Sequence, residues 1–284
     1  MSRRVNLIGY SSAPLYLPQT IAYMAVTGIP ADGTITIYGV SGLSVWTAVN
    51  NFFITGVADG WLSQMMALYL YIGGTATTHK YNAVNPLDTD AAFRVTWAGT
   101  ITHSATGVKG NGVNGWGDTH LIYSTSLSPY SSAIGYYNSL NDWSVDRMDI
   151  GASGGYLPIF AIFKSIAPGN VFVGDGLDYG AHRIFRNIGS VTGLFDMSIE
   201  SNVMQSLARN GVLLGSVNTV PQTQSNGPAV PIALMARRDN ANPVQFSPAT
   251  YNMHYIAKGL TIAQRLSFYN AIQALQVILN RPAI

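Results

Sequence analysis

The chain has no cysteine and carries little charge. The absence of cysteine excludes disulfides, thiolate metal sites and cysteine nucleophiles. Charged residues make up 10% of the 284 positions, against roughly 25% in an ordinary globular protein. Because 48% of the residues are hydrophobic, a core can form, and neutral polar residues must cover much of the surface. Such a surface suits contact with other subunits or with sugars, since little charge has to be desolvated.

The sequence also lacks a basic cluster and a long apolar run. The formal net charge is +2, and the adjacent basic pairs are Arg3–Arg4 and Arg237–Arg238, so we expect no nucleic-acid binding. Residues 61–73 form the longest apolar segment, which is too short to span a bilayer. Prolines interrupt residues 1–18, which therefore do not resemble a signal peptide. We expect neither secretion nor membrane insertion.

The residue types needed for catalysis are scarce. A glycosidase needs two carboxyl groups about 5 to 9 Å apart, and Glu200 is the only glutamate. Asp142, Asp146 and Asp149 cluster in NDWSVDRMD, which we interpret as a solvated turn rather than a tuned acid pair. No Gly-x-Ser-x-Gly motif is present. We therefore predict a protein that is not an enzyme, with a polysaccharide-degrading enzyme as an alternative.

No metal or cofactor site is predicted. The histidines are dispersed, without the spacings of metal motifs: His79, His103, His120, His182 and His254. Calcium, which prefers oxygen ligands, is the one ion kept open. It could use Asp175 and Asp178, or the group from Asp142 to Asp149.

The first quarter of the chain predicts an arm followed by helices. Residues 1–44 are rich in Pro, Gly, Tyr and Thr, and we interpret them as an N-terminal attachment arm. Apolar residues at helical spacing in VWTAVNNFFI, and then WLSQMMALYLYI after Asp59, predict a helical hairpin over residues 45–74. Residues 1–44, 45–74 and 75–284 are the predicted divisions of the chain.

Residues from about 75 onwards predict strands and a terminal helix. FRVTW (93–97) alternates apolar and polar positions, and Asn210–Gly211 favours a tight turn between two strands. Many short strands with Gly- and Asn-rich turns indicate an antiparallel sandwich or jelly roll. Thr261 and Gln264 form a capping-box pattern at the start of an amphipathic helix over 261–280. Its predicted apolar stripe is Ile262, Leu266, Tyr269, Ile272, Leu275 and Leu279.

Three stretches together resemble one group of proteins. They are NNFFITGVADGWLSQMMALYLYIGG with the following THKYNAVNPLDTDAAFRVTWAGTITHSATGVKGNG, then LARNGVLLGS, then GLTIAQRLSFYNAIQALQVILNR. In this order they cover most of residues 45–281. They resemble the laminin-G-like, concanavalin-type jelly-roll structural proteins of bacteriophage particles, found on tails, fibres or capsid surfaces.

The resemblance implies a mainly β, antiparallel jelly-roll sandwich on the surface of a phage virion. Its expected partners are other virion subunits, including copies of itself, and glycans of the host cell surface. The expected role is adhesion and structure. A decoration or tail-assembly subunit without a ligand is the second possibility, and the position on the particle stays open.

Two aromatic-rich stretches are the candidate carbohydrate site. Sugar sites place aromatic faces against the apolar face of a pyranose and surround them with Asn and Asp hydrogen bonds. NGWGDTH and YYNSLNDW supply both types in loop-like sequence. The candidate residues are Trp116, Asp118, Tyr136, Tyr137, Asn141 and Trp143. The alternative is that these aromatic residues belong to a core or a subunit interface.

Overall fold

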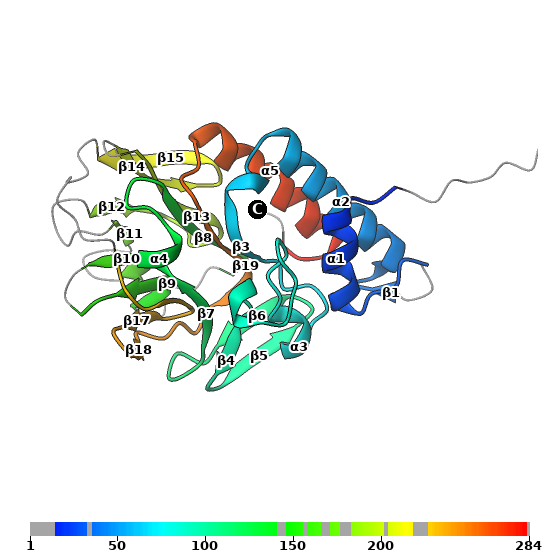
Figure 1. The fold of residues 1–284 in the computed structure, drawn as a ribbon, viewed down its shortest axis with the longest axis horizontal. Helices are drawn as coiled ribbons and strands as arrows, with labels where there is room; N and C mark the ends of the chain where they lie inside the picture. The colour runs from blue at the N-terminus through cyan, green and yellow to red at the C-terminus, as the bar shows by residue number, and fades with distance from the viewer. Residues whose placement is uncertain are drawn as a thin grey trace, which may run out of the picture.

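The protein is an antiparallel two-sheet β-sandwich with helices packed on one side (Figure 1). The computed structural model describes residues 15–32, 36–140, 146–155, 158–165, 171–176, 183–201, 204–217 and 227–282. The mainly β fold that the sequence predicts is confirmed. Within the described residues, no helix is long and apolar enough to cross a membrane.

One sheet has nine strands. Seven follow each other in the order β12-β11-β10-β9-β16-β7-β4, and the short strands β17 and β18 join at β9. In chain order they are β4 (Thr96–Ala98), β7 (Trp116–Ile122), β9 (Arg147–Ser153), β10 (Ile159–Ser165), β11 (Val171–Gly176), β12 (Ile184–Asn187), β16 (Pro231–Leu234), β17 (Arg237–Asp239) and β18 (Asn242–Val244). Consecutive neighbours pair antiparallel, whereas β17 runs parallel to β9.

The second sheet has eight strands. Its order is β15-β14-β13-β8-β19-β6-β5, and β3 pairs with β19 as well. In chain order they are β3 (Met65–Tyr69), β5 (Ile101–Ser104), β6 (Gly107–Gly110), β8 (Ser132–Asn138), β13 (Gly193–Ser201), β14 (Met204–Arg209), β15 (Val212–Val217) and β19 (Thr250–Ala257).

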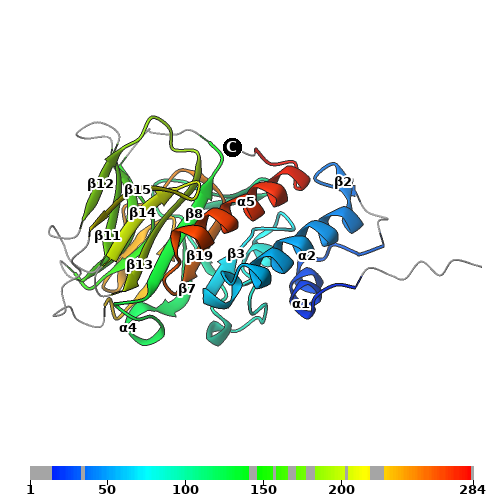
Figure 2. The same ribbon diagram turned by 90° about the horizontal axis from the view of Figure 1, so that it is seen from above.

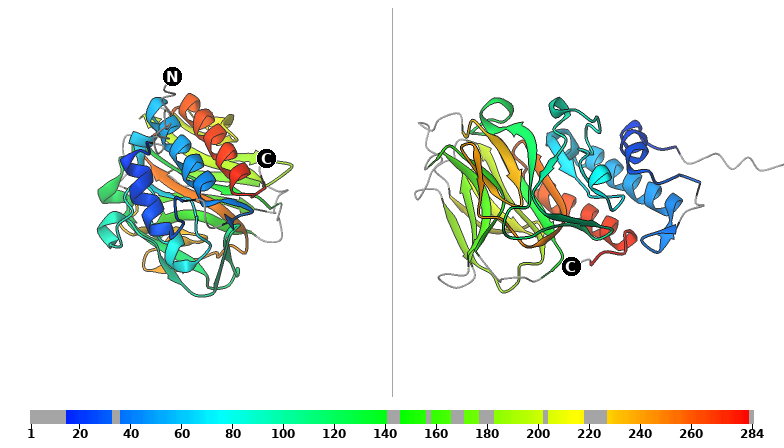
Figure 3. Two further views of the ribbon diagram at one scale, coloured as in Figure 1. Left: turned by 90° about the vertical axis from the view of Figure 1, so that its right-hand side faces the viewer. Right: turned by 90° about the horizontal axis from the view of Figure 1, so that it is seen from below.

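The helices form a third layer on the outer face of the eight-stranded sheet (Figures 2 and 3). The long helices are α1 (Pro18–Thr27), α2 (Gly42–Ala58) and α5 (Ile262–Ile278). Short elements are β1 (Thr36–Ile37), β2 (Val40–Ser41), η1 (Leu62–Gln64), α3 (Ala76–His79), η2 (Asp90–Ala92) and α4 (Tyr123–Ser126). The outer face of the nine-stranded sheet carries no long helix among the described residues.

Alternation along the strands divides the apolar residues between two cores. On β8, Ile134 and Tyr136 face the other sheet, whereas Ala133 and Tyr137 face the helices. Phe160 and Ile162 of β10 meet the first core from the opposite sheet. The middle of the eight-stranded sheet is therefore buried on both faces, and strands β8 and β19 are buried at every position.

The predicted helical hairpin is half wrong. Its first helix is confirmed as α2, where Ser41 caps the helix start by accepting a hydrogen bond from the amide of Ser44 at 3.2 Å. The predicted second helix is instead the turn η1 and strand β3, which pairs with β19. Strand β3 is buried on both faces, with Tyr69 toward one core and Leu68 toward the other, so its apolar run carries no period of two.

Much of the predicted N-terminal arm, within residues 15–32 and 36–44, packs on its own chain, and its role in attachment stays a prediction. Helix α1 lies against α2, and Asn50 of α2 holds it through two hydrogen bonds. The Asn50 Oδ1 atom accepts from the amide of Leu17 at 2.8 Å and from the hydroxyl of Thr20 at 3.0 Å. Residues 1–14 lie outside the described part of the chain.

Two sequence signals at the end of the chain are confirmed. Asn210 and Gly211, with φ of 55° and 71°, form the tight turn between β14 and β15. Thr261 and Gln264 form the capping box of α5.

The predicted apolar stripe of α5 is confirmed at Ile272, Leu275 and Leu279, which are buried, and is wrong at its start. Ile262 and Leu266 are exposed, whereas Arg265 is fully buried and pairs with buried Asp196 on β13. One position on the buried face of α5 is thus occupied by a charge, which an apolar pattern does not reveal.

Candidate functional site

The candidate carbohydrate residues do not come together. Trp116 and Asp118 lie on β7 of the nine-stranded sheet and are partly exposed. Tyr136 and Tyr137 lie on β8 of the other sheet. Asn141 and Trp143 fall outside the described residues.

The placement of Tyr136 and Tyr137 in a surface loop is wrong. Both side chains are 0% exposed, one in the inter-sheet core and the other beneath the helices. Tyr136 stacks on Phe195 with 5.6 Å between ring centroids. Neither tyrosine therefore has surface with which to hold a sugar, and the core alternative applies to this pair.

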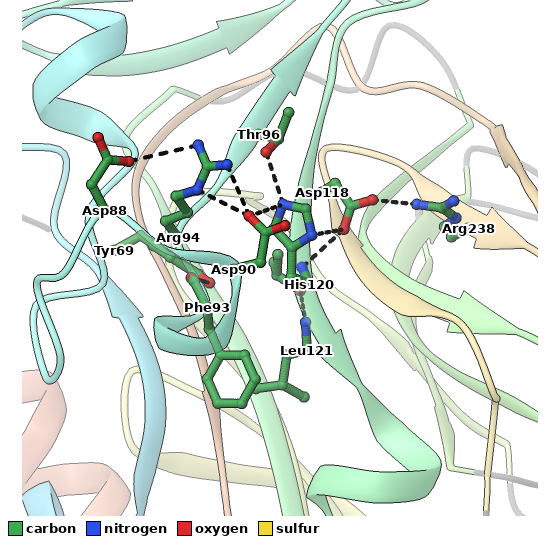
Figure 4. Close-up of polar contacts among 11 residues, drawn as sticks. Tyr69, Asp88, Asp90, Phe93, Arg94, Thr96, Asp118, His120, Leu121 and Arg238 are labelled. Atoms are coloured by element: carbon green, nitrogen blue, oxygen red, sulfur yellow. Dashed lines mark hydrogen bonds and ion pairs between the residues drawn. The ribbon is translucent and has the colours of Figure 1, made fainter.

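Asp118 belongs to a charged network around His120 (Figure 4), and Trp116 lies against Arg238, one of its members. The network, called the His120 cluster below, consists of Lys80, Asp88, Asp90, Arg94, Thr96, Asp118, His120 and Arg238. His120 Nε2 lies 2.8 Å from the Thr96 hydroxyl and 3.4 Å from Asp90 Oδ1. Arg238 forms an ion pair with Asp118, and its guanidinium lies 5.3 Å from the centroid of the Trp116 ring.

The carboxylates of the His120 cluster are paired with cations of the same cluster. Asp88 pairs with Lys80 at 2.6 Å, Asp90 pairs with Arg94 at 2.9 Å, and Asp118 pairs with Arg238. Each carboxylate thus already has a cation. We interpret the cluster as a set of contacts that holds the η2 segment, β7 and β17 together. The same contacts fix the position of Arg238.

The predicted solvated aspartate turn is wrong for Asp149. Asp149 lies on β9 and is 0% exposed, with Arg147 Nε at 3.3 Å and Lys164 Nζ at 3.7 Å. The Tyr251 hydroxyl donates to the same carboxylate. Burial, followed by the charge of Asp149, raises the pKa of Tyr251 well above its usual range. These charges form an interior network, so Asp149 cannot join Asp142 or Asp146 in a surface calcium site.

An open groove of about 510 Å³ lies on the outer face of the nine-stranded sheet. This volume falls within the roughly 300–1,000 Å³ of small-molecule sites. Strands β9, β10 and β17 contribute to it. Its lining residues are Met148, Gly155, Ile159, Phe163, Arg183, Arg237, Asp239 and Gln245.

The groove combines an apolar base with a polar rim. Met148 and Ile159 form the base, and Phe163 packs against them as a partly exposed ring. Arg183, Arg237 and Asp239 supply charges at the rim. An apolar floor with a few placed polar groups is the usual construction of a site for a small ligand.

Strand alternation directs the two adjacent arginines to different places. Arg237 lines the groove, whereas Arg238 reaches Asp118 and Trp116. The predicted residues Trp116 and Asp118 are therefore linked to the groove through one strand, although they do not line it.

One sequence signal indicates a strand of the groove. IFAIF (159–163) is apolar at five successive positions, which is typical of a strand buried on both faces. Phe160 and Ile162 enter the sandwich core, and the other three positions form the outer apolar cluster. No sequence pattern connects this strand with Arg237 or Gln245, which are distant along the chain.

The described residues contain no group of three or more histidine, aspartate or glutamate side chains that could hold a metal ion. Asp142 and Asp178 lie outside them, and nothing is described for the side chain of Asp175. The calcium alternative for these positions stays a prediction.

The comparisons with solved structures support the fold. A botulinum neurotoxin type C structure, from work on cell entry through interaction with two ganglioside molecules, matches with a TM-score of 0.54 and 13% identity over 76% of this chain and 53% of that one. The binding domain of botulinum neurotoxin DC, in complex with rat synaptotagmin II, matches with a TM-score of 0.52 and 11% identity, over 74% and 52%. This chain thus spans about half the length of these structures. At such identity the likeness shows the fold alone.

No protein-family model and no curated protein sequence matches the chain.

Proposed function

We propose that the protein is a glycan-binding β-sandwich module and that its ligand occupies the groove over β9, β10 and β17. The observation that carries this proposal is the combination of an apolar base at Met148 and Ile159, a partly exposed Phe163 ring, and hydrogen-bonding side chains around them. A sugar presents an apolar ring face and a circle of hydroxyl groups, so it needs both kinds of surface.

The groove supports binding rather than hydrolysis. Asp239 is the one carboxylate among its described lining residues, whereas hydrolysis of a glycosidic bond generally needs two. Glu200, the only glutamate, lies on β13 beside Ser206 in the other sheet. We therefore propose a protein without enzymatic activity, and measurable release of reducing ends from a bound polysaccharide would overturn this part.

The test of binding is a glycan screen with point variants. Phe163→Ala removes the ring at the base of the groove and should abolish binding of any glycan that the wild type retains. Tyr130→Ala removes a partly exposed aromatic residue elsewhere, between α4 and β8, and should leave binding unchanged. Equal binding by Phe163→Ala, folded as judged by circular dichroism, would place the site elsewhere.

We further propose that the module is a surface subunit of a phage particle. The sequence resemblance supports this, and so does the arrangement of the faces. The groove opens on the side opposite the helices. Attachment of the module to a particle through its helices would therefore leave the groove facing outward. Many copies would then convert weak contacts into avidity.

The helix layer has the composition of a subunit contact. The one charged residue within α2 and α5 is Arg265, which is buried. Apolar side chains are nevertheless exposed on the two helices: Leu43, Ile54, Val57, Ile262, Leu266 and Val277. A face with no charge to desolvate supports assembly with neighbouring virion subunits or with further copies of this chain.

Mass spectrometry of purified particles tests the virion assignment. We expect the chain in particles, with antibody-gold label on an outer surface. Presence in infected cells with absence from particles would overturn it. Presence in particles without glycan binding would instead favour a decoration or tail-assembly subunit.

A further inference from the structure

The rim of the groove is richer in positive than in negative charge. Among the described lining residues, Arg183 and Arg237 carry guanidinium groups and Asp239 carries the one carboxylate. Charge is scarce in this chain, so three charged side chains around one groove are a local concentration.

Aromatic rings hold the first guanidinium in place. Arg183 Cζ lies 5.4 Å from the centroid of the Phe163 ring and 5.6 Å from that of Phe185. A cation over an aromatic ring is attracted by the negative face of the ring, so these two contacts hold a positive charge at the groove.

The guanidinium of Arg237 has hydrogen-bond donors that its neighbours among the described residues do not use. Arg237 Nη2 lies 3.8 Å from Asp239 Oδ2, which is too long for a hydrogen bond. Asp239 is held through its other oxygen, which accepts from the Ser153 hydroxyl at 3.1 Å. Arg237 Nε is buried and has no hydrogen-bond partner among the described residues. Because Nε is buried, a ligand would meet the part of the guanidinium that stays exposed, and the Arg237 side chain as a whole is 17% exposed.

We propose that the ligand of the groove is an acidic saccharide whose carboxylate pairs with Arg237. This inference rests on the proposed glycan-binding function. The planar fork of a guanidinium matches the two oxygens of a carboxylate. The sugar ring would lie on Phe163, with Asp239 and Gln245 within reach of its hydroxyl groups.

The test compares one oligosaccharide in three forms, all measured by isothermal titration. The forms carry a carboxylate, the corresponding reduced alcohol, or a sulfate. We expect the wild type to bind the carboxylate form roughly ten-fold or more tightly than the alcohol, because a hydrogen bond to a charged group is worth at least that factor. Affinity for the carboxylate form should also fall with rising salt.

Arg237→Gln should remove the preference for the carboxylate while it keeps the affinity for the alcohol. Arg94→Gln, a matched loss of an arginine in the His120 cluster, should keep the preference. Equal wild-type affinity for carboxylate and alcohol would overturn the acidic ligand alone, and equal affinity for sulfate would overturn the choice of carboxylate. Binding of none of the three forms, nor of any glycan in a wider screen, would instead overturn the proposed function.

Discussion

Arg237 and Asp239 lie two positions apart on β17, face the same groove, and stand 3.8 Å apart without a hydrogen bond between them. The carboxylate therefore neutralises part of the positive rim without occupying the arginine. Arg237 should therefore strengthen the binding of an acidic ligand, and Asp239 should weaken it.

Asp239→Asn should tighten binding of a carboxylated saccharide. The change removes the negative charge beside Arg237, and the amide oxygen can still accept from the Ser153 hydroxyl. For a partly exposed charge we expect a gain of a few-fold, corresponding to about 1 kcal/mol at most. Isothermal titration at low salt measures it. Weaker binding would mean that Asp239 contributes a hydrogen bond that the ligand needs more than it needs charge.

Gly56→Ala should destabilise the helix layer although alanine is the better helix former. A Cβ atom at Gly56 would lie 2.6 Å from the Trp61 ring, which is fully buried. Overpacking of this kind typically costs about 1–3 kcal/mol of unfolding free energy, which exceeds the helix-propensity gain of roughly 1 kcal/mol.

Gly189→Ala is the matched control for Gly56→Ala. No atom lies within 4 Å of the position of its Cβ. Urea unfolding of both variants makes the comparison, and Gly189→Ala should change stability by less than about 1 kcal/mol. A Gly56→Ala variant as stable as the wild type would contradict the tight packing of α2 on Trp61.

Arg265→Met should be among the most damaging single changes outside the apolar core. It would leave Asp196 buried on β13 without its counter-charge. Loss of one partner of a buried pair typically costs about 3–5 kcal/mol, so we expect a large fall in the urea midpoint. The double variant Arg265→Met with Asp196→Leu should recover part of the loss. A double variant less stable than the single one would contradict this explanation.

Stability should fall as the pH falls from 7 toward 5, with buried histidines contributing. Burial lowers the pKa of His254 to about 3 and that of His79 to about 2, and it also lowers the pKa of His103. In the unfolded chain these groups titrate near 6.5, so below that pH unfolding takes up protons that the folded state does not bind. Each histidine can contribute up to about 1.4 kcal/mol per pH unit.

The paired histidines show why protonation is unfavourable. The Gly74 amide donates to His79 Nε2 at 3.0 Å, so the proton of the neutral ring is on Nδ1, which faces His103 Nδ1 at 3.1 Å. A second proton on His79 would break the contact with Gly74. Protonation of His103 at Nδ1 would place two donors face to face.

His254→Gln isolates the contribution of one histidine to the pH dependence. Burial raises the pKa of Asp196 and of Glu200, which acts in the opposite direction on stability as the pH falls. Comparison of the variant with the wild type at each pH cancels these groups. The variant should show a shallower fall in unfolding free energy between pH 7 and 5, and an unchanged slope would contradict the lowered pKa of His254.

Local signals in the sequence predicted local structure well. Asn210–Gly211 defined a hairpin and Thr261 with Gln264 defined a helix start, because turn and cap chemistry depends on a few adjacent residues. Strand β3 was predicted as a helix because burial on both faces removes the alternation that marks a strand. The first turns of the apolar face of α5 were misplaced because an ion pair with a residue 69 positions away holds Arg265 inside.

The candidate site was harder to predict because it is assembled from distant segments. Trp116 and Asp118 lie on strand β7 rather than in the predicted loop, and their partner Arg238 lies 120 positions from Asp118. The groove unites Met148, Phe163 and Arg237 through the pairing of β9 with β10 and with β17. Neither the composition nor the spacing of residues along the chain predicts that strand pairing.

The most direct test of the groove is a methyl NMR titration of the selectively labelled protein with a bound glycan. Met148 and Ile159 lie at the base of the groove, whereas Met24 lies on α1, in the core between the helices and the eight-stranded sheet. We expect the methyl signals of Met148 and Ile159 to shift and saturate with added glycan, while that of Met24 stays in place. Saturating shifts elsewhere, with Met148 and Ile159 unmoved, would contradict ligand binding in the groove.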